Sequence, residues 1–502
     1  MPNNRTRLAI AGVLALVLLA GLATWLLAGA GGETTRRHVT AGGVPLDEIH
    51  PPATATAGRR PGVVVAHGFA GSARLMTQFG DALAAQGYVV VLLDFSGHGA
   101  NTRLLPDGAA STGDSTTALQ RDLDAATAHL RALPDVDPSR IALVGHSMGA
   151  SAVTRYAVAH PEVMATVAIS LPDSSAVRPE RPARLLLLVG GLEFPSFRAE
   201  SESAAEPAGP DRSMVVVPGV EHISILYAPR THREIASWLG ESFGAPAADR
   251  PLPAPIRRLA GAGMLLLALL AGLYPVARLL LGAARGGRPP LLGPQLGVTF
   301  AVAAPIAAVA ALIAPLLPTN RLPLAVGGYV AGFVTLAGAA LLGYHRWRGA
   351  IFPAPAPLTP PGRLRLAVAT PLLIGYAATT IAVPTHLGLT HTVPVGARWW
   401  LLLIVWAGFA VLAFAAERVT AGNSFGVLAV SAALMIALTG AAIAGLTSGF
   451  VLLVVPLLAV LLAWQAGWSA LLHRFAAPPW LISLVGSVVV AWPIATTLPV
   501  IG

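Results

Sequence analysis

The chain has 502 residues, of which 55% are hydrophobic and only 11% charged, far below the roughly 25% charged residues of soluble domains. Its 33 basic and 24 acidic residues give a formal net charge of +9, and it contains no cysteine. The composition therefore argues against an ordinary soluble protein, and the lack of cysteine excludes disulfides, zinc–thiolate sites and a cysteine nucleophile.

The first predicted element is an apolar segment over residues 8–30. Its length matches the roughly 20 residues that a helix needs to cross a bilayer. A cleaved signal peptide is the alternative, because Ala28-Gly29-Ala30 is a small-residue stretch that suits cleavage. The apolar run is longer than the roughly 7 to 15 residues of a signal-peptide core, so residues 1–30 are interpreted as a membrane anchor.

Two buried strands are predicted next, over residues 61–66 and 88–93, from short apolar runs. The first is followed by His67-Gly68-Phe69-Ala70-Gly71 and the second by Asp94-Phe95-Ser96-Gly97-His98-Gly99. His67 is interpreted as a structural histidine rather than as a catalytic base.

A third apolar run, residues 141–144, leads directly into Gly145-His146-Ser147-Met148-Gly149, and residues 150–157 are predicted to be helical. Gly-x-Ser-x-Gly at a strand-to-helix junction is the signature of a nucleophile elbow. The glycines allow the tight turn that holds the serine hydroxyl exposed in a strained conformation. We therefore predict that Ser147 is a nucleophile, with an oxyanion hole formed by the backbone N–H groups of Met148 and Phe69.

These motifs resemble those of the α/β-hydrolase superfamily, which often has an Asp-x-x-Gly-His-Gly loop where Asp94–Gly99 lies. The resemblance covers roughly residues 36–243 and is closest to lysophospholipases, esterases and serine aminopeptidases. It implies a mostly parallel sheet flanked by helices and acyl transfer to the serine followed by hydrolysis, without metal or cofactor. In such proteins the Asp94 loop is structural, so neither Asp94 nor His98 is assigned a catalytic role.

An acid and a histidine should follow the serine in chain order. Glu193 follows a predicted strand over residues 184–189, where the family usually has aspartate, and His222 follows the strand over residues 214–217. The predicted triad is Ser147, His222 and Glu193, with His222 as base and Glu193 orienting its ring. Asp173, after the strand over residues 165–170, is the alternative acid.

Other interpretations remain open at this point. Glu193 could be a solvated acid in a loop, and His222 could be an ordinary surface histidine. Residues 165–184 leave no room for a large cap, which favours an open site, and a helix over about residues 230–243 would close a hydrolase domain spanning 31–250. The Ser-, Ala- and Glu-rich segment 194–212 either shapes the site or is disordered.

Residues 251–502 contain one carboxylate, Glu417, against 13 arginines, and the whole chain has no lysine. Hydropathy predicts an all-α bundle of about eight transmembrane helices here. They are expected over residues 259–277, 296–317, 322–344, 366–386, 399–416, 425–445, 450–472 and 480–500.

The arginines predict the orientation of these helices. With Arg5 and Arg7 in the cytoplasm, alternate threading places eight loop arginines inside: Arg285, Arg288, Arg346, Arg348, Arg363, Arg365, Arg418 and Arg474. Only Arg321 and Arg398 fall in outside loops between helices, with Arg257 and Arg258 a further exception beside the hydrolase. This positive-inside bias puts residues 31–255 outside the cytoplasm.

The sequence thus predicts a serine hydrolase embedded in a bacterial cytoplasmic membrane and acting on lipophilic or envelope esters. The alternatives are a permease or scaffold with an accessory hydrolase, a catalytically inactive hydrolase-like binding domain, and a serine peptidase. The bilayer is the expected partner; nucleic acid is not, because the arginines of the second half flank membrane spans. The histidines of this half have no metal-ligand spacing, so neither metal nor cofactor is expected.

Overall fold

The computed structural model describes residues 4–52, 58–106, 113–206, 209, 211–244, 251–286, 292–353 and 358–502, with side chains from residue 11 onward. The side chains of Arg5, Arg7 and Arg288 and the predicted boundary at residue 250 lie outside what is described. The chain forms two compact units. The first contains Met1–Leu265, Pro384–Val395 and Pro499–Gly502, and the second contains Leu266–Val383 and Gly396–Leu498.

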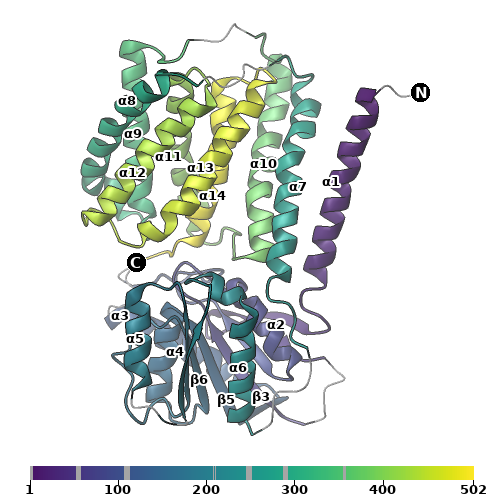
Figure 1. The fold of residues 1–502 in the computed structure, drawn as a ribbon, viewed down its shortest axis with the longest axis vertical. Helices are drawn as coiled ribbons and strands as arrows, with labels where there is room; N and C mark the ends of the chain where they lie inside the picture. Colours follow the sequence, from purple (N-terminus) through teal and green to yellow (C-terminus); the bar gives the residue numbers. More distant parts are fainter. Residues whose placement is uncertain are drawn as a thin grey trace. The chain divides into compact units, whose positions relative to one another are not determined.

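An eight-stranded sheet is the centre of the first unit (Figure 1). Its strands are β1 (Thr35–Ala41), β2 (Val44–His50), β3 (Arg60–Ala66), β4 (Val89–Leu93), β5 (Val136–His146), β6 (Ala165–Ile169), β7 (Leu185–Gly190) and β8 (Arg212–Val217). They follow the order β1-β2-β4-β3-β5-β6-β7-β8. β2 is antiparallel to both β1 and β4, and all other neighbours are parallel. The mostly parallel sheet expected from the resemblance is present.

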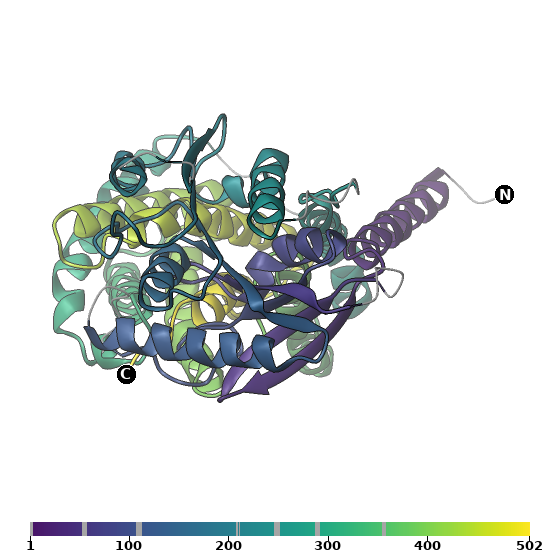
Figure 2. The same ribbon diagram turned by 90° about the horizontal axis from the view of Figure 1, so that it is seen from below.

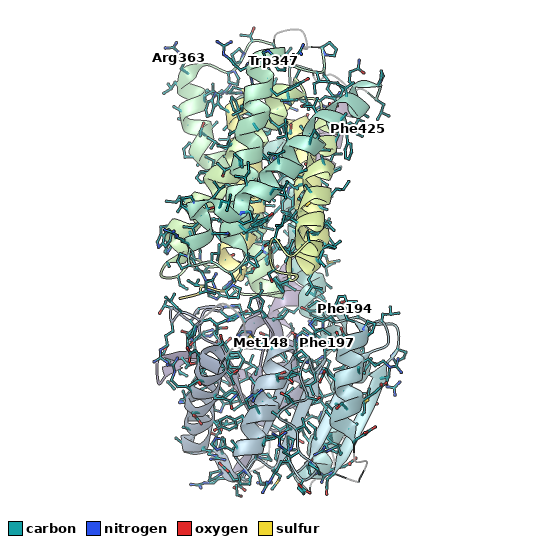
Figure 3. All side chains as sticks on the ribbon, turned by 90° about the vertical axis from the view of Figure 1, so that its left-hand side faces the viewer. Met148, Phe194, Phe197, Trp347, Arg363 and Phe425 are labelled. Atoms are coloured by element: carbon teal, nitrogen blue, oxygen red, sulfur yellow. The ribbon has the colours of Figure 1, made fainter. Side chains whose placement is uncertain are left out.

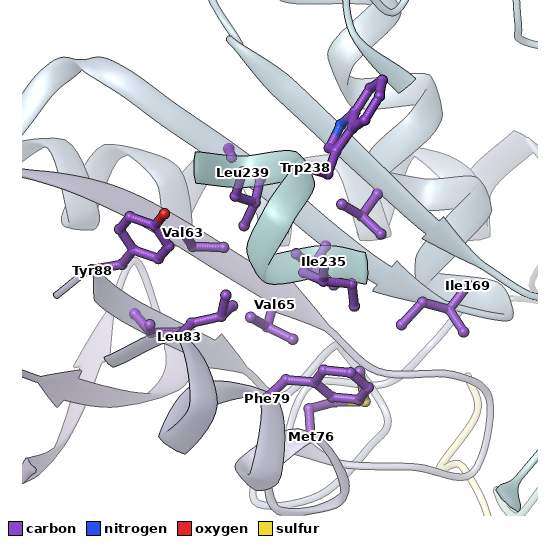
Figure 4. Packing of buried hydrophobic residues seen from close by; sticks show 14 of the residues in the cluster. Val63, Val65, Met76, Phe79, Leu83, Tyr88, Ile169, Ile235, Trp238 and Leu239 are labelled. Atoms are coloured by element: carbon purple, nitrogen blue, oxygen red, sulfur yellow. The ribbon is translucent and has the colours of Figure 1, made fainter. Parts of the chain in front are cut away.

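Helices cover both faces of this sheet (Figure 2). The helices are α2 (Thr77–Ala85), α3 (Gly113–Ala132), α4 (Met148–Ala159), α5 (Pro195–Ala205) and α6 (Pro229–Ser242). One buried cluster joins the sheet to α2 and α6 (Figure 4). The opposite face packs against α3, α4 and α5. The sheet and these five helices therefore form a three-layer structure.

The alternation of side chains along the central strands explains their apolar sequences. Val63 and Val65 of β3 point into the layer of α2 and α6, whereas Val64 and Ala66 point into the layer of α3 and α4. A parallel strand buried on both faces must be apolar throughout, which is why β3 is visible in the sequence. The edge strand β1 has the sequence TRRHVTA and is largely exposed, so periodicity alone gave it no signal.

Nine helices in the described part of the chain are long and apolar enough to cross a membrane. The first is α1 (Asn4–Ala28), in the first unit. The others are α7 (Arg257–Leu281), α8 (Gln295–Ile313), α9 (Gly327–Arg348), α10 (Arg363–Gly388), α11 (Arg398–Val419), α12 (Ser424–Ile443), α13 (Val451–His473) and α14 (Pro479–Thr497). They match the predicted spans one for one.

The helical unit has Trp347, Arg363 and Phe425 at the same end (Figure 3). These residues belong to the end of α9, the start of α10 and the start of α12. Alternate threading assigns the loops beside them to one side of a membrane, so the packing of the helices agrees with the predicted up-and-down order.

Candidate active site

The turn between β5 and α4 has the geometry of a nucleophile elbow. Ser147 adopts φ 54° and ψ −121°, a conformation that non-glycine residues rarely occupy and that costs about 1–3 kcal/mol. The flanking glycines are required by close packing, because a Cβ at Gly149 would lie 2.6 Å from the carbonyl oxygens of Ala66 and His67. The turn therefore presents Ser147 at the carboxyl end of β5, against the loop that follows β3.

Ser147, His222 and Glu193 form a continuous chain of hydrogen bonds. The Nε2 atom of His222 lies 3.1 Å from the Ser147 hydroxyl oxygen, and its Nδ1 atom lies 3.1 Å from Oε1 of Glu193. An ionised carboxylate only accepts, so the ring N–H at Nδ1 donates to Glu193 and leaves Nε2 to accept the serine proton. The three residues come from the ends of β5, β8 and β7, where parallel strands bring loops to one edge of the sheet.

Glu193 is held in place by a residue that the sequence did not single out. The Ser170 hydroxyl donates a 2.6 Å hydrogen bond to Oε2, and the Phe194 N–H donates to Oε1 at 3.2 Å. Burial alone would raise the pKa of Glu193, but the hydrogen bonds from His222 and Ser170 outweigh it and lower the pKa below its ordinary value. The carboxylate is thus kept charged beside the histidine. Ser170 lies at a positive φ of 51° after β6, a feature visible only in three dimensions.

His146 supports the loop that carries the base. Its ring N–H at Nε2 donates a 2.9 Å hydrogen bond to the backbone carbonyl of His222, and the two rings lie 4.8 Å apart. Burial, together with the charge on His222 when protonated, lowers the pKa of His146 to about 3. His146 is therefore a neutral donor at ordinary pH. Its position next to the nucleophile was the only sequence signal, and it carried no indication of this contact.

Asp173, the alternative acid, lies elsewhere. Its carboxylate is 3.5 Å from the Arg155 guanidinium and accepts a 2.9 Å hydrogen bond from the Ser175 N–H. Burial would raise its pKa, but the hydrogen bonds from Ser175 and the charge of Arg155 lower it. The structure brings Glu193 to His222 and leaves Asp173 in a surface ion pair.

The two N–H groups predicted to hold an oxyanion belong to the start of α4 and to the loop after β3. Met148 is the first residue of α4, and N–H groups in a first helical turn have no partner inside the helix. Phe69 lies in the loop after β3, which approaches the nucleophile so closely that a Cβ at Gly68 would be 3.0 Å from Cβ of Ser147. The loop that carries Phe69 and the start of α4 therefore lie on either side of the Ser147 turn, and the oxyanion hole remains a prediction.

His67 and the loop after β4 are structural, in line with the sequence interpretation. The His67 ring donates from Nδ1 to the Gly68 carbonyl at 2.7 Å and accepts the Phe95 N–H at Nε2 at 3.1 Å. Burial lowers its pKa to about 4. The Asp94 carboxylate accepts hydrogen bonds from two backbone N–H groups, and His98 donates to the Ser96 carbonyl. These contacts join the two loops to each other.

Apolar side chains surround the histidine. Leu192, Phe194 and Ile223 are 68%, 46% and 44% exposed, and the ring of Phe197 lies 4.7 Å from that of His222. Phe194 and Phe197 appear at the same edge of the unit as Met148 (Figure 3). The exposed apolar side chains thus come from the same two loops that supply Glu193 and His222.

Within the described ranges, no cluster of three or more His, Asp or Glu side chains is arranged to hold a metal ion. The helical unit does contain a buried polar group, Glu417, which accepts hydrogen bonds from the Ser469 hydroxyl and from Nε2 of His473. Here the serine donates to the acid rather than to the histidine, so this group is not a second nucleophilic triad. It joins α11 to α13.

Residues 58–217 match the family model described as serine aminopeptidase, S33. Two uncharacterized proteins, from two strains of Mycobacterium tuberculosis, are each 32% identical over 188 residues, which cover 33% of this chain. The chain spans only 64% of the length of each of these relatives.

Solved structures also resemble the chain. A hypothetical protein from Pseudomonas aeruginosa is 15% identical, with 42% of this chain and 94% of that one covered, at a TM-score of 0.36. A serine hydrolase without a lid from Xanthomonas campestris is 22% identical, with the same two coverages, at a TM-score of 0.33. The sheet and the family model agree that residues 58–217 have the α/β-hydrolase fold, in a chain that continues into a bundle of apolar helices.

Proposed function

We propose that the protein is a membrane-anchored serine hydrolase that cleaves carboxylic esters with lipophilic groups. The observation that carries this proposal is the hydrogen-bonded series Ser147–His222–Glu193. The intact series and the strained elbow favour an active enzyme over an inactive binding domain, because a domain without catalysis has no need to retain either feature.

In the proposed reaction, the Ser147 hydroxyl oxygen attacks the ester carbonyl carbon while His222 takes the serine proton at Nε2. The carbonyl π electrons move to oxygen, and the N–H groups of Phe69 and Met148 stabilise the resulting oxyanion. Collapse of this intermediate expels the alkoxide, which His222 protonates, and leaves an acyl-serine. Water, deprotonated by His222, then releases the acid and restores the serine. Glu193 stabilises the imidazolium in both steps.

An ester with an apolar group is the substrate class that the surroundings of His222 support. Leu192, Phe194 and Ile223 would pack against a hydrocarbon chain. Each Å² of apolar surface that this contact removes from water contributes roughly 25 cal/mol to the free energy of binding. A serine peptidase remains the second candidate, because the matched family model is described as an aminopeptidase. The exposed apolar side chains of the loops that supply Glu193 and His222 are the reason for preferring the ester.

The proposed location is the outer face of a bacterial cytoplasmic membrane, with the helices as anchor and scaffold. A permease driven by protons or sodium usually needs ionisable groups inside its membrane helices. In residues 251–502 the sole carboxylate, Glu417, is committed to Ser469 and His473 near the ends of α11 and α13. This supports a scaffold over an ion-coupled carrier.

The test uses the full-length protein in detergent or nanodiscs. Wild type should react with a fluorophosphonate probe and should hydrolyse p-nitrophenyl esters faster as the acyl chain lengthens from acetate to octanoate. Ser147→Ala should lose labelling and lower kcat by several orders of magnitude, while Ser151→Ala, one turn further along α4, should keep both. Labelling that persists in Ser147→Ala would refute the assignment, and faster cleavage of aminoacyl p-nitroanilides than of esters would favour the peptidase.

A further inference from the structure

The loop that carries Phe69 ends at Ser72, which contacts a segment from the far half of the sequence. The hydroxyl oxygens of Ser72 and Thr390 lie 2.9 Å apart and share a hydrogen bond, although the residues are 318 positions apart. The backbone N–H of His391 also donates to the Ser72 hydroxyl, at 3.0 Å. Ser72 is 1% exposed and Thr390 7%, so water does not compete for these bonds.

Thr390 lies in the segment Pro384–Val395, which belongs to the first unit together with the hydrolase. The segment turns sharply at the end of α10, where the N–H groups of Leu389 and Thr390 both donate to the Thr385 carbonyl at 2.9 Å. Leu389 packs against the buried cluster of the sheet, α2 and α6. A turn fixed at both its backbone and its side chain can hold the Thr390 hydroxyl at a constant position.

The other side of the Phe69 loop contacts the loop after β4, and that loop is held by a second remote segment, Pro499–Gly502. Val500 donates from its N–H to the Gly97 carbonyl at 2.8 Å and accepts the Leu105 N–H at 2.9 Å. A Cβ at Gly97 would lie 2.5 Å from the Val500 carbonyl oxygen, so the glycine allows this approach. The loop after β4 contacts the start of the Phe69 loop, because the Phe95 N–H donates a hydrogen bond to His67.

Both ends of the Phe69 loop are thus fixed by contacts that lead to residues beyond 380. We propose that Thr390, acting through Ser72, is a positioning residue for the oxyanion hole. It fixes the distance between the Phe69 N–H and Ser147. This inference rests on the proposed function, since it assigns Thr390 to the same site. An oxyanion donor must lie about 2.7–3.1 Å from the developing charge, so a loop displaced by a fraction of an ångström loses catalysis without losing substrate.

The primary variant is Thr390→Val, which removes the hydroxyl and keeps the β-branched shape. We expect kcat for p-nitrophenyl octanoate to fall about tenfold with KM nearly unchanged, a smaller loss than the roughly 10²–10³-fold cost of deleting an oxyanion donor outright. Thr390→Ser, which retains the hydroxyl, should restore the rate. Thr379→Val is the matched control, because the Thr379 hydroxyl bonds only to the Gly375 carbonyl of its own helix among the hydrogen bonds described.

A second readout separates positioning from general damage. The probe is an alkyl trifluoromethyl ketone. The Ser147 oxygen attacks its carbonyl carbon, the serine proton moves to His222, and the former carbonyl oxygen becomes an oxyanion in the proposed hole. The affinity of the ketone should fall in Thr390→Val by the same factor as kcat. The corresponding secondary alcohol forms no oxyanion and should bind equally to both proteins. Rates are expressed per mole of monodisperse protein, so a loss of folded material does not imitate the effect.

The two proposals fail in distinguishable ways. Wild type that neither reacts with fluorophosphonate nor cleaves esters contradicts the proposed function. An active wild type whose kcat and ketone affinity are unchanged in Thr390→Val contradicts the role of Thr390 alone. Equal losses of ketone and alcohol binding, or no rescue by Thr390→Ser, would likewise overturn it. In the double variant Ser72→Ala/Thr390→Val, kcat should be no lower than in Ser72→Ala, since both changes act through one contact.

Discussion

Two residues of the candidate site, Glu193 and His222, are each held by a neighbour that has no part in the proposed reaction. Ser170 fixes the carboxylate of Glu193, and the His146 ring fixes the backbone of His222. A hydrogen bond to a charged group is worth about 1.5–3 kcal/mol, which is enough to favour one orientation of the Glu193 carboxylate strongly. The arrangement therefore keeps Glu193 and His222 in the hydrogen-bonded series with Ser147 without a substrate.

The contacts of Glu193 and Asp173 predict different effects of replacing each carboxylate by an amide. Glu193→Gln keeps the size of the side chain but removes the charge that stabilises the imidazolium, so kcat for ester hydrolysis should fall about 10³–10⁴-fold. Asp173→Asn should change kcat less than twofold, because Asp173 pairs with Arg155 at the surface. Steady-state assays of both purified variants test this. A larger loss in Asp173→Asn than in Glu193→Gln would reverse the assignment.

A buried carboxylate joins elements that are far apart in the sequence. Asp81 of α2 pairs with both Arg36, in β1, and Arg258, at the start of α7. The start of α7 is therefore tied to the edge of the sheet through one carboxylate. The Arg257 guanidinium lies 4.9 Å from the centre of the Trp25 ring. These contacts give a structural reason for two arginines on the side where the positive-inside rule expects few.

Packing also explains Arg398, at the start of α11, which the threading predicts to lie outside. It is fully buried and donates from one guanidinium nitrogen to the carbonyls of Ala495, at 3.0 Å, and Leu498, at 2.7 Å. The last carbonyls of a helix have no partner within it, and a cation there also interacts favourably with the helix dipole. Arg398 thus caps α14, and its place among the outside arginines is explained by packing.

Replacing this cap should destabilise the helical unit. Arg398→Met keeps the length and apolar stem but leaves buried carbonyls without their donor, at a cost of about 1–3 kcal/mol each. We expect a clear drop in the thermal unfolding midpoint in detergent, followed by differential scanning fluorimetry. Arg321→Met is the control, because Arg321 is exposed in the short helix Pro318–Arg321 and its loss should matter little. Equal midpoints for both variants would contradict the capping role.

At the scale of the molecule, the segments that pack with the hydrolase indicate which connections between helices share its side of a membrane. The first unit includes Pro384–Val395, between α10 and α11, and Pro499–Gly502, after α14. Residues that contact the hydrolase must lie on its side of a membrane. Threading nine spans in alternation, from the arginine distribution alone, puts the hydrolase, the α10–α11 connection and the end of α14 on one side. The contacts within the first unit are thus compatible with the predicted alternate threading.

A protease experiment checks which side this is. Added to intact spheroplasts, a nonspecific protease should cut between residues 31 and 255 and spare the loop at residues 346–365, because the positive-inside rule places that loop in the cytoplasm. Lysed spheroplasts, in which both regions are accessible, provide the control. A hydrolase protected in intact spheroplasts would invert the topology and move the proposed substrate from the envelope to the cytoplasm.

The sequence alone was sufficient to predict the strands buried on both faces, the elbow at Ser147, the apolar helices and the loops that supply Glu193 and His222. These features depend on local patterns, since a strand buried on both sides must be apolar and a tight turn needs its glycines. Polar elements such as β1 and α3 were not predicted, because they pack on only one side and their sequences resemble ordinary surface segments.

Tertiary structure alone decided which loops meet. Glu193 and Asp173 both follow strands, and the fold brings Glu193 within 3.1 Å of His222 while it leaves Asp173 beside Arg155. The same holds for the contacts of Thr390 with Ser72 and of Val500 with Gly97. Short hydroxyl and backbone groups have no sequence pattern that specifies a partner hundreds of positions away. Their pairing depends on where folding places the backbone, and that position is set by the packing of the sheet and helices around them.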